Sequence, residues 1–131
     1  MKEKDFQGSF NHWLARHWHN GSAAFELKIV KHPDKSLPFS AIADHQYKGL
    51  ELATKRIVWK IPDTDLRQKP FDCFILQEAG AYVVVLWHIP RKQNLVTILD
   101  IKELNLYRAV SSKKSLNQKD AETLASYIIE L

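Results

Sequence analysis

Two charged residues stand two positions apart inside an otherwise apolar segment, residues 23–30. Small, aromatic and branched side chains, between Gly21 on one side and Pro33 on the other, predict a strand here. Because side chains alternate between the two faces of a strand, Glu26 and Lys28 are expected to point to the same side. A carboxylate and an ammonium on an apolar strand are costly to desolvate unless they are paired or used.

Two interpretations of this pair are open. In the first, Glu26 binds a divalent cation with help from the backbone carbonyl of Leu27, and Lys28 holds an attacking water or a phosphate oxygen. In the second, the two side chains form an ordinary ion pair on a half-exposed edge strand. Side chains that other segments bring to the same face would favour the first interpretation.

The composition is that of one globular domain over residues 1–131, with 45% hydrophobic and 26% charged residues. No apolar run approaches the roughly 18 residues that cross a bilayer, so neither a membrane partner nor a signal peptide is expected. The single Cys73 excludes an internal disulfide and a cysteine-based zinc site, and we expect a cytoplasmic protein. Four unclustered glycines argue against a phosphate-binding P-loop.

Hydrophobic periodicity predicts a helix on each side of this strand in the chain. The first covers about residues 5–19, and Gln7 lies next to its apolar face, with Glu3 one turn earlier. The second runs from about 41 to 53 and carries Gln46 in the middle of its inward face. This glutamine is either a buried amide bonded to backbone or a polar group directed at the same site as the charged pair.

The sequence predicts four further strands, at residues 56–61, 71–76, 81–87 and 95–101. The second and third are expected to form a hairpin through a loop that contains Gly80. The continuously apolar segment 81–87 predicts a central strand buried on both faces. We therefore expect an α/β domain with a central mixed sheet of about five strands flanked by helices.

Capping signals mark two helix starts. Ser40 is expected to cap the second helix. Ser115 and Gln118 form a capping box for a last helix, whose apolar stripe reaches Ile129. Between these helices, the basic and hydroxyl-rich segment 108–114 is either a solvated connection or a set of phosphate contacts.

Four short segments combine into a pattern, and they are Phe25-Glu26-Leu27-Lys28, residues 37–46 with their Leu-Pro-Phe and His-Gln, Lys69-Pro70-Phe71-Asp72, and residues 81–85. This pattern resembles the PD-(D/E)XK nuclease superfamily. Within it, the pattern is most similar to the Holliday junction resolvases of the archaeal and phage type and of the bacterial RecU type. The resemblance covers roughly residues 5–105 and implies a restriction-endonuclease-like fold.

The resemblance implies hydrolysis of DNA phosphodiester bonds with Mg²⁺ or Mn²⁺ as the cofactor. It assigns catalytic roles to Glu26, Lys28, Asp72 and Gln46, and metal ligation to Glu26, Asp72 and the carbonyl of Leu27.

The chain departs from the family pattern at two places. The metal-binding Asp of the family usually precedes the E-x-K strand, and no acid stands there in this sequence. We therefore expect Asp72 to lie beside Glu26 on a strand that comes later in the chain. The first helix of the family often supplies a Glu, whereas the matching face here carries Gln7. The number of bound metal ions, one or two, therefore stays open.

The expected partner is branched or duplex DNA, and the net charge of +4 is compatible with a polyanion. Basic residues expected to contact phosphates are Lys31, Lys35, Lys60, Arg67 and Lys69. Two symmetric cuts in a four-way junction imply a homodimer, and the compact size suggests a phage or mobile-element origin.

Three other functions stay open from the sequence. One is a mismatch, flap or nicking nuclease, which would use the same catalytic residues. Another is a non-catalytic nucleic-acid-binding module on a nuclease-like fold. The third is an α/β interaction protein in which the charged pair is merely an ion pair.

Overall fold

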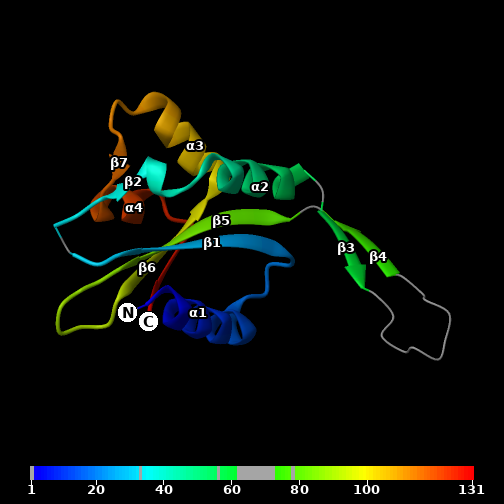
Figure 1. Cartoon of the computed structure of the whole chain (residues 1–131). Helices are drawn as coiled ribbons and strands as arrows, with labels where there is room; N and C mark the ends of the chain where they lie inside the picture. Colours follow the sequence, from blue (N-terminus) through cyan, green and yellow to red (C-terminus); the bar gives the residue numbers. More distant parts are fainter. Residues whose placement is uncertain (1, 33, 56, 62–72, 78) are drawn as a thin grey trace.

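The computed structural model describes residues 2–32, 34–55, 57–61, 73–77 and 79–131. Over 57–61 and 73–77 the description covers the backbone alone. The centre of the fold is a four-stranded mixed sheet in the order β1-β5-β6-β8 (Figure 1). Its strands are β1 (Ala23–Val30), β5 (Gly80–Trp87), β6 (Leu95–Asp100) and β8 (Tyr127–Glu130). The expected α/β fold with a central mixed sheet flanked by helices is confirmed, with four strands in the central sheet.

Helices cover both faces of this sheet (Figure 1). One face packs against α1, and the opposite face packs against the other three helices. The helices are α1 (Glu3–His17), α2 (Asp44–Lys55), α3 (Ile101–Val110) and α4 (Gln118–Leu124). None of these described helices combines the length and the hydrophobicity needed to cross a bilayer.

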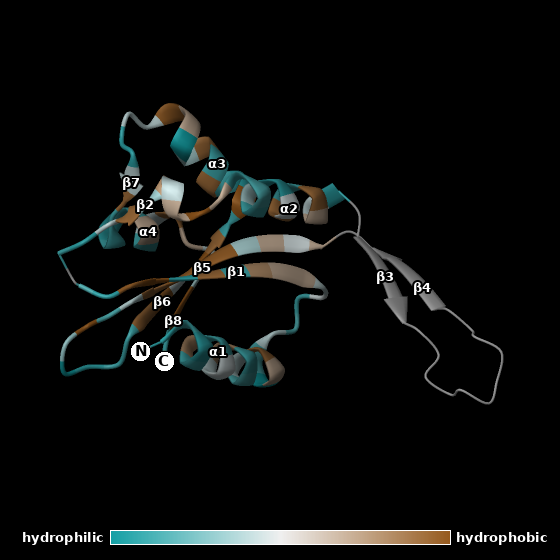
Figure 2. Cartoon of the chain, in the orientation of Figure 1, coloured by the Kyte–Doolittle hydropathy of each residue, from teal (hydrophilic) through white to brown (hydrophobic). Residues whose placement is uncertain are grey.

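Strand β5 supplies the core on both sides of the sheet. Its alternate residues Val83 and Val85 face the α2 side, whereas Val84 and Leu86 face α1, and all four are at most 1% exposed. The strand can be apolar throughout because β1 pairs with it in parallel on one edge and β6 pairs antiparallel on the other. Hydrophobic colour accordingly runs along the centre of the sheet in Figure 2. The predicted central strand is confirmed.

The first helix begins and ends two residues earlier than predicted, at Glu3 and His17 instead of about residues 5 and 19. Phe6 and Phe10 lie one turn apart and are fully buried under the sheet. After the helix, the indole of Trp18 donates a hydrogen bond to the carbonyl of Gly21, at 2.9 Å. Gly21 adopts a φ of +79°, which favours glycine, and the chain then turns into β1.

The expected hairpin between residues 71–76 and 81–87 is wrong. β4 (Cys73–Gln77) pairs instead with β3 (Ile57–Ile61), and the two form a separate antiparallel sheet. Gly80 is the first residue of β5 rather than a turn residue. A Cβ at this position would lie 2.7 Å from the ring of Tyr82, so a larger residue would require that ring to shift.

The last helix is shorter than predicted and has a different cap. Ser115 belongs to β7 (Ser115–Leu116), which pairs with β2 (Leu37–Pro38), so the predicted capping box is wrong. The side chain of Asn117 caps α4 instead by accepting from the N–H of Asp120, at 2.8 Å. Residues 127–130, which we expected in the helix, form β8 against β6.

Helix α3 was not expected from the sequence. The predicted strand 95–101 ends at Asp100, whose carboxylate accepts from the N–H of Lys102 and so begins the helix. The basic segment 108–114 therefore starts inside the last turn of α3 and continues as a connection to β7.

The strand assignment of the C-terminus predicts different costs at two neighbouring isoleucines. Ile129 packs against the α1 side of the core, whereas Ile128 is 48% exposed. Ile129→Lys should lower the free energy of unfolding by about 1–2 kcal/mol, because part of an apolar side chain loses its burial. Ile128→Lys is the matched control and should cost much less in chemical denaturation. Equal losses would contradict the strand, since neighbours in a single helical stripe would behave alike.

A carboxylate-centred cluster fixes the end of α3 to the start of α4. Lys113 Nζ donates to Asp120 Oδ2 at 2.9 Å, and the hydroxyl of Tyr107 donates to the same oxygen at 2.7 Å. The hydrogen bond from Lys113, and then the one from Tyr107, lower the pKa of Asp120 below its ordinary value. The bond that Lys113 donates to Asp120 is the largest cause of the raised pKa of Lys113, and the separate bond that Tyr107 donates to Asp120 is the largest cause of the raised pKa of Tyr107.

This cluster predicts a pH-dependent contribution to stability. Because the pKa of Asp120 is lower in the folded state, its stabilisation is present at neutral pH and is lost as the pH falls from about 4 towards the folded-state pKa. The difference in Tm between the wild type and Asp120→Asn should therefore be clear at neutral pH and shrink in acid. Glu122→Gln, an exposed change on the same helix, is the control and should leave Tm nearly unchanged. A difference that stays constant with pH would contradict the assignment.

Candidate functional site

The predicted charged pair lies on the outer edge of the central sheet. Glu26 and Lys28 point to the same side of β1, and Lys28 Nζ lies 3.5 Å from Glu26 Oε1. Their side chains are 26% and 20% exposed, respectively. Among the described strands, β5 alone pairs with β1, so the pair stands at an edge with partial access to water. The predicted same-side arrangement is confirmed, and it has the geometry of an ion pair on a half-exposed edge strand.

Gln46 connects this pair to helix α2. Its Nε2 donates to Glu26 Oε1 at 2.8 Å, and its Oε1 accepts from the N–H of Ala43 at 2.9 Å. The second bond caps the first turn of α2, since Ala43 immediately precedes the helix. Ser40 lies in the short 3-10 helix Phe39–Ala41, so the predicted cap is wrong. Gln46 is thus both bonded to backbone and directed at Glu26.

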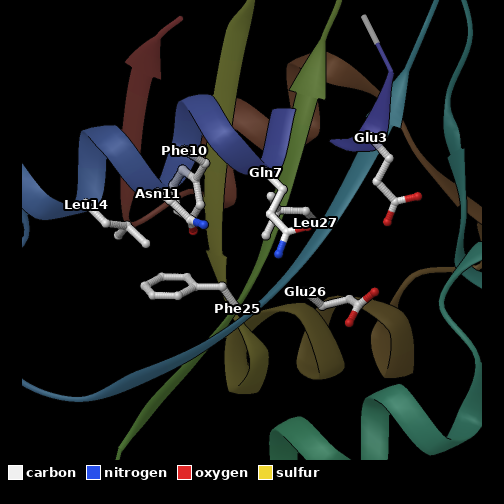
Figure 3. Close-up of a pocket in the computed structure, with 8 residues that line it drawn as sticks. All are labelled: Glu3, Gln7, Phe10, Asn11, Leu14, Phe25, Glu26 and Leu27. Atoms are coloured by element: carbon white, nitrogen blue, oxygen red, sulfur yellow. The ribbon is translucent and has the colours of Figure 1, made fainter. Parts of the chain in front are cut away.

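A cavity of roughly 300 Å³ opens between α1 and β1 (Figure 3). Glu3, Gln7 and Asn11 line it from successive turns of α1, and Phe25, Glu26 and Leu27 line it from β1. Figure 3 shows Glu3 and Gln7 extending from the helix towards β1, the strand that carries Glu26. Sequence reasoning missed Asn11, although its spacing of four residues from Gln7 places it on the same helix face.

A second cavity, of roughly 350 Å³, continues along the same edge. It shares Glu3 and Leu27 with the first cavity and adds Lys28 and Lys31. The two cavities form what we call the edge groove, with carboxylates at Glu3 and Glu26 and cationic groups further along β1. Of the predicted phosphate-contacting residues, Lys31 lines this groove and Lys35 is exposed without lining it.

Several predicted site residues cannot be placed. Asp72, Arg67 and Lys69 lie outside the described residues, as does the side chain of Lys60. The expected pairing is nevertheless wrong for the strand that follows Asp72, because β4 pairs with β3 and not with β1.

The donors in the edge groove suit a hard divalent cation. Glu3, Gln7, Glu26 and Leu27 are among the residues that line the first cavity, and they carry carboxylate, amide and backbone carbonyl oxygens. Mg²⁺ prefers such ligands and retains several waters. Over the part of the chain that the structure describes, no three His, Cys, Asp or Glu side chains gather closely enough to hold a metal ion. The cavity thus offers oxygen donors of the type that Mg²⁺ prefers, from two acidic residues rather than three.

Comparisons with known proteins place the chain in no family. No protein-family model matches it. No curated protein and no solved structure shows significant similarity to it.

Replacing the amide of Gln46 by a carboxylate tests whether the site holds cations. Gln46→Glu keeps the acceptor for Ala43 but turns a hydrogen bond to Glu26 into repulsion between two carboxylates. At neutral pH this should cost on the order of 1–3 kcal/mol of stability. Millimolar Mg²⁺ or Mn²⁺ should restore Tm towards the wild-type value, because a cation would neutralise the new pair.

Gln93→Glu, the same chemical change at an exposed loop position, is the control. Its Tm should neither fall nor respond to the cations more than the wild type does. A loss of stability in Gln46→Glu that divalent cations leave unchanged would argue against cation binding at Glu26.

Proposed function

We propose that this chain is a metal-dependent, structure-selective DNA endonuclease that cleaves Holliday junctions. The observation that carries the proposal is the convergence at Glu26, whose carboxylate is approached by Lys28 from the same strand and by Gln46 from a separate helix. The carboxylate of Glu3 lines the same groove from a third element. An ion pair with a merely structural role does not require polar side chains from two further helices. The sequence resemblance to junction resolvases supports the same function.

The residues of the groove would have different roles in phosphodiester hydrolysis. Glu26, the Leu27 carbonyl and Glu3 would hold the cation, with Gln7 as a neutral oxygen donor, and the sequence resemblance alone would add Asp72 as a further ligand. When bound, Mg²⁺ supplies Lewis acidity towards a phosphate oxygen and lowers the pKa of water.

Lys28 and Gln46 would act on the charge and the orientation of the reacting groups. The ammonium of Lys28 would stabilise the negative charge that develops on the phosphate oxygens and orient the attacking water. Gln46 fixes the carboxylate of Glu26, because its own amide is held by the backbone of Ala43. A ligand held in this way loses little conformational freedom when substrate binds.

The proposed partner is branched DNA, and the proposed assembly is a homodimer. Lys28 and Lys31 give the edge groove cationic groups that can meet phosphates, and the net charge of +4 favours a polyanion. A four-way junction has two equivalent strands to cut, so a two-fold symmetric pair of subunits would place one site on each.

One observation favours a second candidate, a non-catalytic nucleic-acid-binding module. Glu26 is already engaged by Lys28 and Gln46, and within the described ranges a third acidic or histidine ligand does not join it. Gln7 also stands where a carboxylate would bind a second cation more strongly. Such a module would bind DNA through its basic groups without cutting it.

Cleavage of an end-labelled four-way junction separates these functions. Wild-type protein should make paired symmetric nicks near the branch point with Mg²⁺ and none with EDTA. Glu26→Gln and Lys28→Ala should each lower the cleavage rate by roughly 100-fold or more, because each removes charge from the reacting centre. Asp72→Asn tests the relocated ligand, and Glu130→Gln, an exposed change on β8, should retain full activity.

Each outcome identifies a different function. Equal cutting of the junction and of a linear duplex of the same sequence would retain the nuclease and reject the junction specificity. Binding without cutting in both Mg²⁺ and Mn²⁺ would select the non-catalytic module. Full activity in Glu26→Gln or Lys28→Ala would overturn the assignment of the site, and full activity in Asp72→Asn would remove that residue from it.

A further inference from the structure

A third cavity, of roughly 500 Å³, lies beside the first turn of α2 and outside the edge groove. We call it the Arg108 hollow, and its lining residues are Phe39, Ser40, Ile42, Ala43, Asp44, Tyr47 and Arg108. The hollow joins the 3-10 helix and α2 to the last turn of α3. The charged side chains among these lining residues are those of Arg108 and Asp44.

The guanidinium of Arg108 is held in a fixed position. Its Cζ lies 3.7 Å from the centre of the Tyr47 ring and 5.8 Å from that of Phe39. Its Nη1 donates to Asn105 Oδ1 at 3.1 Å, and Asn105 in turn donates to Glu51 Oε1 at 2.8 Å. Stacking on an aromatic face immobilises the planar group while its edges stay available for hydrogen bonds.

The hydrogen-bonding capacity of Arg108 exceeds what its neighbours use. A guanidinium has five N–H donors, and among the described residues its side chain donates to Asn105 and makes no ion pair with a carboxylate. Tyr47 does not neutralise it, because burial raises the pKa of the phenol and its hydroxyl donates to the carbonyl of Phe39. With respect to the described part of the chain, the hollow therefore presents a preoriented cation with donors that Asn105 does not use.

The hollow and the edge groove lie on either side of one hydrogen-bonded link. Ala43 lines the hollow and donates its N–H to Gln46, and Gln46 donates to Glu26 in the groove. An extended polyanion that crosses the first turn of α2 would therefore meet both sites. The forked donors of an arginine match a phosphate, which can accept two parallel hydrogen bonds.

We infer that Arg108 binds a backbone phosphate of the same DNA molecule that lies in the edge groove. The identity of this ligand as DNA rests on the proposed function, whereas the site itself rests on the geometry of the hollow. Arg108 is then a substrate-binding residue that sets the position of the nucleic acid. Asp44, which lines the same hollow, opposes the phosphate and limits the affinity.

Two substitutions in the hollow should change DNA binding in opposite directions. Binding is measured by fluorescence anisotropy with a labelled junction in EDTA, so that cleavage does not interfere, over a series of KCl concentrations. Arg108→Gln should weaken binding roughly tenfold and reduce the salt slope of log K by about 0.9, the value for one lost phosphate contact. Asp44→Asn should strengthen binding, because it removes a carboxylate from the hollow without removing a contact.

Matched controls separate a specific contact from general electrostatics and from misfolding. Lys102→Gln removes the same charge at an exposed position on α3 and should leave the salt slope unchanged. Arg108→Lys keeps the charge without the forked donors and should retain the salt slope while binding more weakly. Circular dichroism must show that Arg108→Gln is folded at the assay temperature. If it is not, the comparison of Asp44→Asn and Arg108→Lys with the wild type decides.

Four results would overturn the inference. They are an unchanged salt slope in folded Arg108→Gln, equal losses in Arg108→Gln and Lys102→Gln, no gain in Asp44→Asn, and no DNA binding by the wild type. Inorganic phosphate that raises the Tm of the wild type but not of Arg108→Gln, without any DNA binding, would assign the hollow to a free phosphate ion. If DNA binding depends on Arg108 but neither the wild type nor any variant cleaves the junction, the inference stands and the proposed nuclease activity fails.

Discussion

The parallel pairing of β1 with β5 determines where the charged pair of the candidate site lies. In its register Glu26 stands beside Val83 and Lys28 beside Val85, and both valines are fully buried towards α2. The two charges can occupy that apolar face because β1 is an edge of the sheet, where their ends keep contact with water. On a central strand the same pair would lose its hydration without an equal gain.

Gln46 is the side chain through which the sheet and α2 act together. Because a neutral amide both accepts and donates, it can satisfy the N–H of Ala43 and the carboxylate of Glu26 at once. A glutamate at this position could cap the helix but would repel Glu26. An apolar residue could neither cap the helix nor form a hydrogen bond with Glu26. The orientation of Glu26 is therefore linked to the start of α2. A change at this helix terminus would alter the position of the Glu26 carboxylate.

The first turn of α2 also lies between the edge groove and the Arg108 hollow. On one side, the edge groove gathers the carboxylates of Glu3 and Glu26. On the other, Arg108 lies stacked on Tyr47. Each group is held by its own neighbours, the carboxylate by hydrogen bonds and the guanidinium by aromatic packing and Asn105.

The sequence by itself determined α1, β1, β5 and the inward position of Gln46, because the alternation and the helical spacing of side chains are local properties. It did not determine which strands pair. Gly80 suggested a hairpin loop, but it is the first residue of β5 and lies against the ring of Tyr82, and β5 finds its partners in β1 and β6. At the C-terminus, neighbouring isoleucines fit a helical stripe as well as a strand, and pairing with β6 decided for the strand. Such pairings depend on hydrogen bonds between segments far apart in the chain, so tertiary structure alone decides them.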